Sequence, residues 1–134
     1  MKTHWIVLAC CLSLPALAET EHPLLPGYAA QARQENPAFA GFSAERGQAL
    51  YVAEEQRSGK TMSCTSCHTT DPRQAGKTPA QRKVDPLAPV ANPKRFTDLA
   101  KVEKWFRRNC DDVFARECTA QEKGDFISWI TGLK

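Results

Sequence analysis

The segment Cys64-Thr65-Ser66-Cys67-His68 dominates the interpretation of this sequence. The pattern C-x-x-C-H is the attachment signature of a c-type haem, whose vinyl groups form thioethers with the two cysteines. The histidine that follows the second cysteine reaches the iron from one face. We therefore expect Cys64 and Cys67 to hold one haem c covalently and His68 to ligate its iron.

Two other kinds of site use a cysteine pair with this spacing. A zinc site needs about four nitrogen or sulfur ligands, and Cys110 and Cys118 are spaced too widely to form its second half. A thioredoxin-like redox pair needs a strand–helix–strand context, which the sequence does not show. The adjacent histidine and an export signal favour haem attachment over both alternatives.

That export signal is predicted over residues 1–18, which read as a cleaved signal peptide. Lys2 gives a positive start, Trp5 to Leu14 is apolar, and Ala16-Leu17-Ala18 is an A-x-A cleavage site. The apolar run is shorter than the about 20 residues that span a bilayer. We therefore expect a periplasmic protein that does not span the membrane. Lipidation at Cys10 is an alternative, although a discarded leader cysteine is the simpler interpretation.

Composition bounds the class of protein further. Removing 18 of the 134 residues leaves about 116, which suits one domain. Four cysteines remain, an even number in an oxidising compartment. The formal net charge of the whole chain, +3, is too small to indicate a nucleic-acid partner. We expect three regions: a signal peptide over 1–18, an N-terminal extension over 19–42 and a cytochrome c domain over 43–134.

The apolar periodicity of this domain predicts three main helices and no convincing strand. Their expected bounds are Ser43 to about Arg57, Asp98 to about Asn109, and Ala120 to about Gly132. Ser43 and Thr97 are the expected caps of the first two, and Thr119 with Glu122 forms a capping box for the third. Gly47 interrupts the first helix at a cost of about 1 kcal/mol relative to alanine, so we expect another backbone to approach it closely.

A long segment from Thr69 to Pro93 separates the first two predicted helices. It contains five prolines and no helical or alternating pattern. Such a segment is unusual in a compact domain, but it is reasonable if it wraps a prosthetic group. A carbonyl near Pro86 or Pro89 could accept a hydrogen bond from the ring of His68, and charges such as Arg95 could pair with a haem propionate. The predicted fold class is all-α, with a further short helix or a tether in the extension.

The second axial position of the iron has no obvious ligand in this sequence. Electron-transfer cytochromes c usually place a methionine or a second histidine there. Met62 is tied to the attachment segment, and His22 lies in the Pro-punctuated extension. The far face is therefore open, or closed by a lysine or by an amide such as that of Asn109. Spacing alone favours a competing role for Asn109, that of a helix C-cap.

Cys110, which follows Asn109, forms with Cys118 the cysteine pair that haem attachment leaves unassigned. A disulfide between them would close a nine-residue loop. In the loop-entropy treatment it would contribute roughly 2.6 kcal/mol of stability. It would also fix the backbone beside Asn109.

Several motifs of this chain resemble those of the SHP family (sphaeroides haem protein), which are oxygen-binding, high-spin class I cytochromes c. Besides the attachment segment, the motifs are Pro86-Leu87-Ala88-Pro89, Arg95-Phe96-Thr97-Asp98, Val102-Glu103-Lys104-Trp105, Arg108-Asn109-Cys110 and Arg116-Glu117-Cys118-Thr119. The likeness runs from about Ala44 to Leu133, and its specific part is the asparagine–cysteine pair. This chain departs from the family pattern at Asp111, Asp112 and Phe114, beside that pair.

The resemblance implies a class I cytochrome c fold, with the haem wrapped by three main helices and the long Pro-rich loop. It also implies that His68 is the proximal ligand, that Asn109 is a labile distal ligand, and that Cys110 and Cys118 form a disulfide. The family's asparagine leaves on reduction and opens a site for oxygen or nitric oxide. A neutral amide is a hard, weak ligand that suits ferric iron better than ferrous iron, which gives this release a physical basis.

The function expected from these observations is that of a periplasmic monohaem cytochrome c that accepts electrons and binds a diatomic molecule when reduced. The resemblance implies a dihaem cytochrome c or a membrane b-type cytochrome as electron donor. A plain electron carrier is one alternative, and an enzyme that reduces or oxidises small nitrogen or oxygen species is another. We expect an electron-transfer and ligand-binding protein rather than an enzyme.

Overall fold

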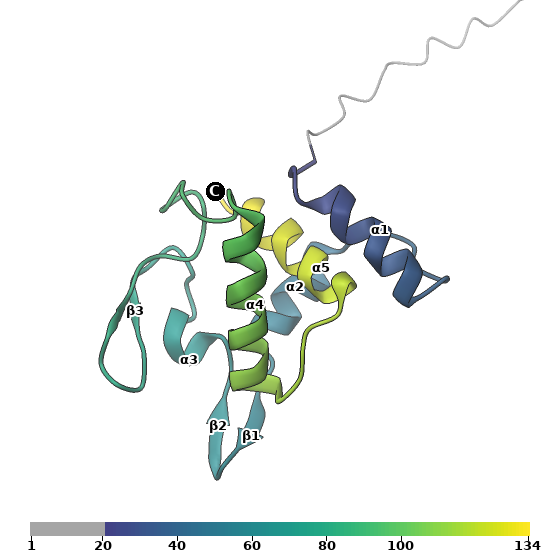
Figure 1. Ribbon diagram of the computed structural model, residues 1–134. Helices are drawn as coiled ribbons and strands as arrows, with labels where there is room; N and C mark the ends of the chain where they lie inside the picture. Colours follow the sequence, from purple (N-terminus) through teal and green to yellow (C-terminus); the bar gives the residue numbers. More distant parts are fainter. Residues whose placement is uncertain (1–20) are drawn as a thin grey trace, which may run out of the picture.

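Five helices and two short hairpins build residues 21–134, the part of the chain that this computed structural model describes (Figure 1). The helices are α1 (Leu25–Glu35), α2 (Ala44–Val52), α3 (Thr65–His68), α4 (Leu99–Phe114) and α5 (Ala120–Thr131). The hairpins pair β1 (Glu55–Arg57) with β2 (Lys60–Met62) and β3 (Gly76–Lys77) with β4 (Lys83–Val84), both antiparallel. The predicted signal peptide lies outside the described residues, within which no helix is long and apolar enough to cross a membrane.

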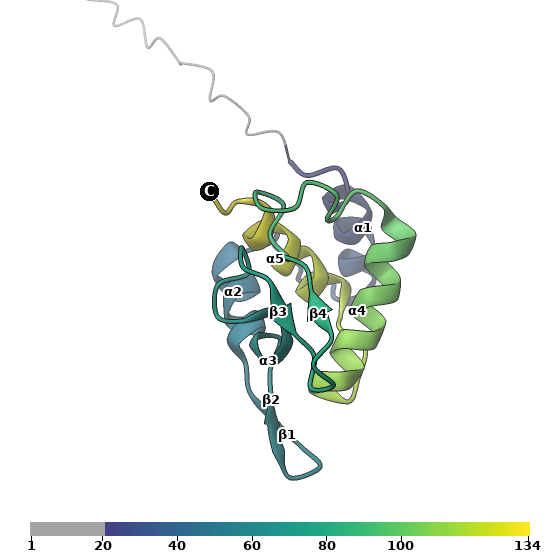
Figure 2. The same cartoon turned by 90° about the vertical axis from the view of Figure 1, so that its left-hand side faces the viewer.

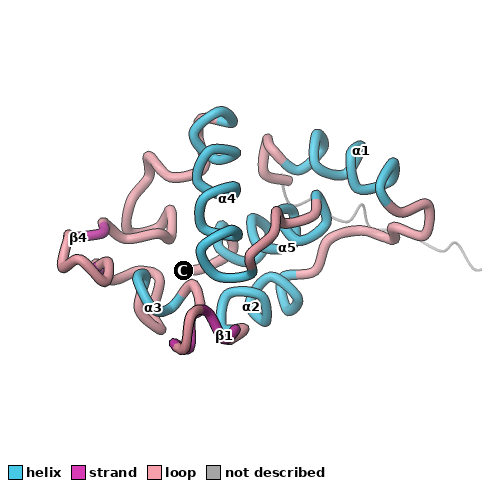
Figure 3. The backbone as a smooth tube through the Cα atoms, turned by 60° about the horizontal axis from the view of Figure 1, so that its bottom comes forward, coloured by secondary structure: helices cyan, strands magenta, loops and turns pink. Residues whose placement is uncertain are grey.

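The core forms around α5, which lies between α2 and α4 in Figures 2 and 3. Ile127 and Ile130 of this helix are fully buried, and burying such a side chain stabilises the fold by about 1.5–3 kcal/mol. Two apolar clusters meet on α5. One includes Leu25 and Tyr28 of α1, so the N-terminal extension packs into the core. The other includes Tyr51 of α2 and borders the attachment segment through Cys64.

Two buried polar networks fix the other helices on α5. The carboxylate of Asp125 accepts hydrogen bonds from Nε and Nη2 of Arg46 at 2.7 and 2.8 Å, which ties α2 to α5. Glu103 of α4 accepts from Nζ of Lys123 at 2.8 Å and from the hydroxyl of Tyr28 at 2.5 Å. The second network joins α1, α4 and α5, and so holds α4 in place from the side away from α3.

The predicted glycine contact and the capping box are confirmed. A Cβ at Gly47 would collide with the backbone carbonyl of Asp125, so only glycine lets α2 approach α5 this closely. At the start of α5 the Thr119 side chain accepts from the amide of Glu122, and the Glu122 carboxylate accepts from the amide of Thr119. The last residue of the helix is Thr131, and its C-cap is Gly132, near which the helix was predicted to end. Of the two alternatives for the extension, a short helix or a tether, the structure shows the helix, α1.

The first main helix is shorter than predicted, and the prediction that no strand forms is wrong. The α2 helix ends at Val52 instead of near Arg57, and the chain turns back through Gly59, at φ +76°, to pair β1 with β2. Residues 54–57 are all polar. They have no apolar side chain to bury, and a helical turn without tertiary packing is marginal in water.

The second main helix is longer than predicted. The α4 helix continues through Asn109 to Phe114 and ends where Ala115 adopts a left-handed conformation, at φ 55°. Cys110 and Val113 are buried on the same side as Val102, so packing extends the helix by more than one turn. The interpretation of Asn109 as a C-cap is therefore wrong. Its N-cap is also Asp98, whose side chain accepts from the amide of Lys101 at 3.1 Å, rather than Thr97.

Candidate haem-binding site

One helical turn, α3, carries the predicted attachment motif. The amides of Cys67 and His68 donate to the carbonyl of Cys64 at 3.3 and 3.1 Å, which closes the turn. Cys64 and Cys67 are free, half-buried thiols, and their i, i+3 spacing puts them on one side of the turn. A c-type haem requires two free thiols for its thioether bonds and a histidine for its iron. The side chains of this turn therefore fit a haem c.

The protonation states of these side chains follow from burial. Burial raises the pKa of Cys64 to about 11, so its thiol is neutral before it reacts. Burial, with a smaller contribution from the charge of Arg95, lowers the pKa of His68 to about 4. The imidazole is therefore neutral at physiological pH, the form in which histidine ligates a metal.

Tyr51 holds the end of α3 and was not identified as a site residue from the sequence. Its side chain is fully buried, and its hydroxyl donates to the carbonyls of His68 at 3.2 Å and Thr69 at 2.6 Å. This contact restrains the backbone that carries the imidazole. Helical spacing puts Tyr51 on the packed side of α2, but nothing in the sequence indicates a partner 17 residues further along the chain.

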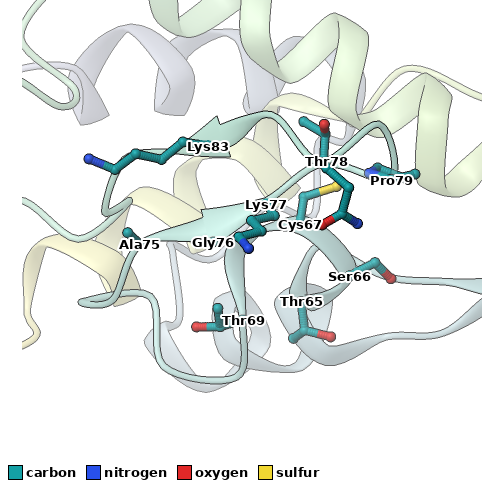
Figure 4. Close-up of a pocket in the computed structure, with 11 residues that line it drawn as sticks. Thr65, Ser66, Cys67, Thr69, Ala75, Gly76, Lys77, Thr78, Pro79 and Lys83 are labelled. Atoms are coloured by element: carbon teal, nitrogen blue, oxygen red, sulfur yellow. The ribbon is translucent and has the colours of Figure 1, made fainter.

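The β3–β4 hairpin lies against α3 within the segment that was predicted to lack structure. A Cβ at Gly76 would overlap the backbone carbonyl of Cys67, so this glycine allows the two backbones to touch. Beside the contact lies an open hollow of about 700 Å³, lined by Cys67, Thr78 and Lys83 among others (Figure 4). The Pro-rich segment therefore contains an ordered hairpin that packs on the attachment turn, and its wrapping of the haem stays a prediction.

Replacing Gly76 by alanine should loosen this contact, because the new Cβ must displace either the hairpin or the Cys67 carbonyl. Overpacking of this kind costs about 1–3 kcal/mol, and each kcal/mol lowers the Tm of a domain of this size by about 4–8 °C. Thermal unfolding followed by circular dichroism checks the loss. Gly27→Ala is the control, since a Cβ there meets nothing within 4 Å. Equal Tm values for the two variants would contradict the close-contact role of Gly76.

The sequence suggested that a carbonyl near Pro86 or Pro89 accepts a hydrogen bond from the His68 ring, and the Pro86 carbonyl does not do so. Within residues 21–134, the carbonyl of Pro86 accepts instead from Nε of Arg95 at 2.9 Å and from Nδ2 of Asn92 at 3.3 Å. These two donors use both of its lone pairs. Nη2 of Arg95 also donates to the carbonyl of Asp85 at 2.9 Å. Arg95 thus fixes the loop and places a positive charge near His68.

Asn109 lies in the interior of α4 and is half-buried. Trp105 and Asp112, one turn before and one turn after it, share its side of the helix. Burial, and then the negative charge of Asp112, raise the pKa of Cys67. Phe106, also one turn away, borders the same apolar cluster as Cys64. The structure therefore brings Asn109 to the region of the attachment motif.

The remaining candidate ligands hold the places that the sequence suggested. Met62 ends β2, two residues before Cys64. His22 precedes α1, where its Nδ1 accepts from the amide of Leu24 at 3.4 Å. Figures 1 and 3 place α1 and α3 on opposite sides of the molecule. The structure therefore does not bring His22 to the motif.

A disulfide joins Cys110 and Cys118, whose Cα atoms are 5.8 Å apart. Both residues are buried. The bridge connects the last turns of α4 to the loop before α5, directly after Asn109. It therefore restrains the part of α4 that carries this amide.

The helical fold and the C-x-x-C-H turn define a c-type cytochrome. Residues 37–130 match the family described as "Domain of unknown function (DUF1924)". The chain is 45% identical over 132 residues to the cytochrome c-type protein SHP of Cereibacter sphaeroides, covering 96% of this chain and 97% of that protein. It is 35% identical over 134 residues to cytochrome c'' of Methylophilus methylotrophus, covering 97% and 93%. The chain belongs to the SHP family of c-type cytochromes, and its cofactor is one covalently bound haem c.

Solved structures agree with this assignment. Oxidised SHP, described as an oxygen-binding cytochrome c, superposes with a TM-score of 0.73 at 43% identity, covering 82% of this chain and 94% of that chain. Oxidised cytochrome c'' of Methylophilus methylotrophus gives 0.75 at 34% identity, covering 83% and 92%. A solution structure of cytochrome c'', described as giving insight into haem-ligand detachment, gives 0.72 at 35% identity, covering 82% and 90%. The predicted all-α fold is confirmed.

Proposed function

We propose that this protein is a periplasmic monohaem cytochrome c whose distal ligand is labile, so that it accepts an electron and then binds oxygen or nitric oxide. Cys64 and Cys67 hold the haem, His68 is the proximal ligand and Asn109 is the distal ligand in the ferric state. The haem supplies the redox-active iron. The residues of the chain attach it, orient it and control access to it.

The observation that carries this proposal is the position of Asn109. Its amide is half-buried in the interior of α4, three residues from Phe106, which borders the same apolar cluster as Cys64. His22 is bound to its own segment at the start of α1, on the other side of the molecule. Asn109 lies one turn from Phe106, and an amide oxygen is a weak ligand for the softer ferrous iron.

Each residue around the motif has a separate part in this proposal. Neutral His68 supplies a nitrogen lone pair to the iron. Tyr51 restrains the backbone of this residue through hydrogen bonds to the carbonyls of His68 and Thr69. Arg95 anchors the loop beside His68 through Asp85 and Pro86. The Asn109 side chain can leave by rotating about its own bonds, because the backbone hydrogen bonds of α4 do not depend on it.

Two relatives support a labile ligand and a diatomic substrate. The SHP structure is described as that of an oxygen-binding cytochrome c, and that chain is 43% identical to this one. The cytochrome c'' structure is described in terms of haem-ligand detachment. We extend both properties to this chain as part of the proposal. The electron donor that we propose is a dihaem cytochrome c or a membrane b-type cytochrome.

Visible spectra of the purified protein with and without carbon monoxide test this function. The ferrous spectrum should change on addition of carbon monoxide, because the sixth position is then vacant. An unchanged ferrous spectrum would contradict the proposal and support the plain electron carrier. Turnover with nitrogen oxides or peroxide at a rate above free haem would instead support the enzyme alternative.

The disulfide should support the distal site by restraining α4 after Asn109. Thiol labelling of the holoprotein without reductant should find no free cysteine, whereas two labelled thiols would contradict the bridge. Replacing Cys110 and Cys118 together by alanine should lower the free energy of unfolding by roughly 2.6 kcal/mol and leave the haem attached. Denaturant unfolding of the two proteins measures the difference.

A further inference from the structure

We propose, on the basis of the proposed function, that Asp112 makes the distal site favour neutral ligands over small anions. The residue is one of the positions at which this chain departs from the family pattern. Its effect would be to weaken the binding of small anions severalfold and to leave the binding of uncharged diatomic molecules unchanged.

The position of Asp112 on α4 is the first step. Trp105, Asn109 and Asp112 follow one another at spacings of four and three residues, which places them in one stripe along the helix. The stripe runs beside the buried side of α4, which carries Val102 and Val113. Asn109 is half-buried at its centre, while Trp105 and Asp112 are exposed on either side. A ligand that approaches the Asn109 position therefore approaches the Asp112 carboxylate as well.

The orientation of this stripe is the second step. Phe106, three residues before Asn109 on α4, borders the same apolar cluster as Cys64, so this part of α4 packs beside the attachment segment. An independent contact agrees: Nη2 of Arg57, in β1, donates to the backbone carbonyl of Asp111 at 3.3 Å. Figure 1 shows the C-terminal end of α4 above the β1–β2 hairpin, and α4 and β1 are in contact.

The charge of Asp112 is not paired within the described part of the chain. The ion pairs found over residues 21–134 do not include it. Arg57 contacts the Asp111 carbonyl instead, and the guanidinium of Arg108 stacks on the Trp105 ring with 5.2 Å to its centroid. Asp112 therefore keeps its negative charge available to act on an approaching ligand.

The consequence follows from simple electrostatics. A carboxylate repels an anion such as azide, and at 0.1 M salt this repulsion decays over about 10 Å. Carbon monoxide, nitric oxide and oxygen have no net charge, so the same carboxylate does not oppose them. The carboxylate also favours the more positive ferric centre over the ferrous one, which is the state in which Asn109 is proposed to be bound.

Azide titration of the ferric holoprotein tests the proposal, with Asp112→Asn as the variant and Asp111→Asn as the matched control. Both substitutions remove one exposed acid from the last turn of α4, where acids oppose the helix dipole, so neither should harm folding. Asp111 points about 100° further around the helix, away from the stripe. At low salt Asp112→Asn should bind azide about two- to fivefold more tightly than the native protein, the range of an exposed charge interaction. High salt should remove most of that gain.

Three results would overturn the selectivity role: equal azide affinity in Asp112→Asn and the native protein at low salt, an equal gain in Asp111→Asn, or no azide binding by any of the three. Ferrous carbon monoxide affinity is measured on the same samples and should not differ among them. Carbon monoxide binding reports separately on the proposed function. Its absence in all three proteins would contradict the diatomic site, whereas a salt-sensitive azide gain confined to Asp112→Asn would still support the role of Asp112.

Discussion

Replacing Cys64 and Cys67 together by serine should abolish the covalent attachment of haem. Thioether bonds survive denaturation, whereas a histidine ligand does not, so mass spectrometry of the denatured native protein should show one haem retained. The double variant should show the mass of the bare chain. The Cys110→Ala/Cys118→Ala protein is the control, because it removes the same number of sulfurs and should keep its haem. An unmodified mass for the native protein, made in cells able to attach haem, would show that the motif is not used.

The same double variant should also be strongly destabilised. Leu87, Phe96 and Phe106 are only partly buried where they border the cluster that contains Cys64, so an apolar group lying against them would stabilise the fold. The attached haem remains on the unfolded chain, so it stabilises the native state by the apolar surface that it buries there. Circular dichroism should therefore show a lower Tm for the variant than for the native protein. An equal Tm would indicate that the polypeptide core alone sets the stability.

Local signals predicted the parts of the site that depend on neighbouring residues. The attachment turn is encoded within five consecutive residues, and the capping box at Thr119 within four. Gly47 was correctly interpreted because a glycine inside a helix usually needs a packing reason, and the Asp125 carbonyl supplies one. The motif and the capping box can be predicted because all of their residues are neighbours in the sequence. The close contact at Gly47 can be predicted because a glycine destabilises a helix unless packing requires it.

Tertiary contacts decided what the sequence did not predict. The last turns of α4 form because Cys110 and Val113 are buried beside Val102, whereas the local pattern around Asn109 resembles a helix end. The hydroxyl of Tyr51 finds carbonyls in α3, and the Pro86 carbonyl finds the Arg95 guanidinium. Each of these partners is selected by the folded arrangement, so no local pattern identifies it. The proposed bond between Asn109 and the iron is also a contact that the folded arrangement selects.

The extended α4 changes what replacement of Asn109 should do to stability. At a C-cap, alanine would have removed a favourable group, but in the helix interior alanine is the best helix former. Asn109→Ala should therefore leave the haem attached and raise the free energy of unfolding by up to about 0.5 kcal/mol, apart from the ligand bond. Asn36→Ala, at the C-cap of α1, is a control that changes an asparagine on the far side of the molecule. Denaturant unfolding of the ferrous proteins measures the free energy of unfolding of both variants. The ferrous state is used because the bond between Asn109 and the iron is proposed to be absent there.

Asn109→Ala should have its largest effect on the ferric iron. Without the amide, the ferric spectrum should shift toward five-coordinate or water-bound iron, because the alanine side chain cannot ligate a metal. Ferric ligand entry should become about tenfold faster or more, which corresponds to loss of a bond worth about 1.4 kcal/mol. Stopped-flow mixing with imidazole, a neutral ligand that Asp112 does not repel, measures this rate. Asn36→Ala should behave as the native protein does.

Asn109→His provides the opposite test at the same position. A second imidazole is a stronger ligand for both oxidation states than an amide. The variant should therefore be low-spin and six-coordinate, and its ferrous form should resist carbon monoxide. This result requires that residue 109 can reach the iron, so it tests the geometry independently of the lability. If Asn109→Ala kept the native ferric spectrum and entry rate, and Asn109→His still bound carbon monoxide freely, Asn109 would be a half-buried helix residue with no part in ligation.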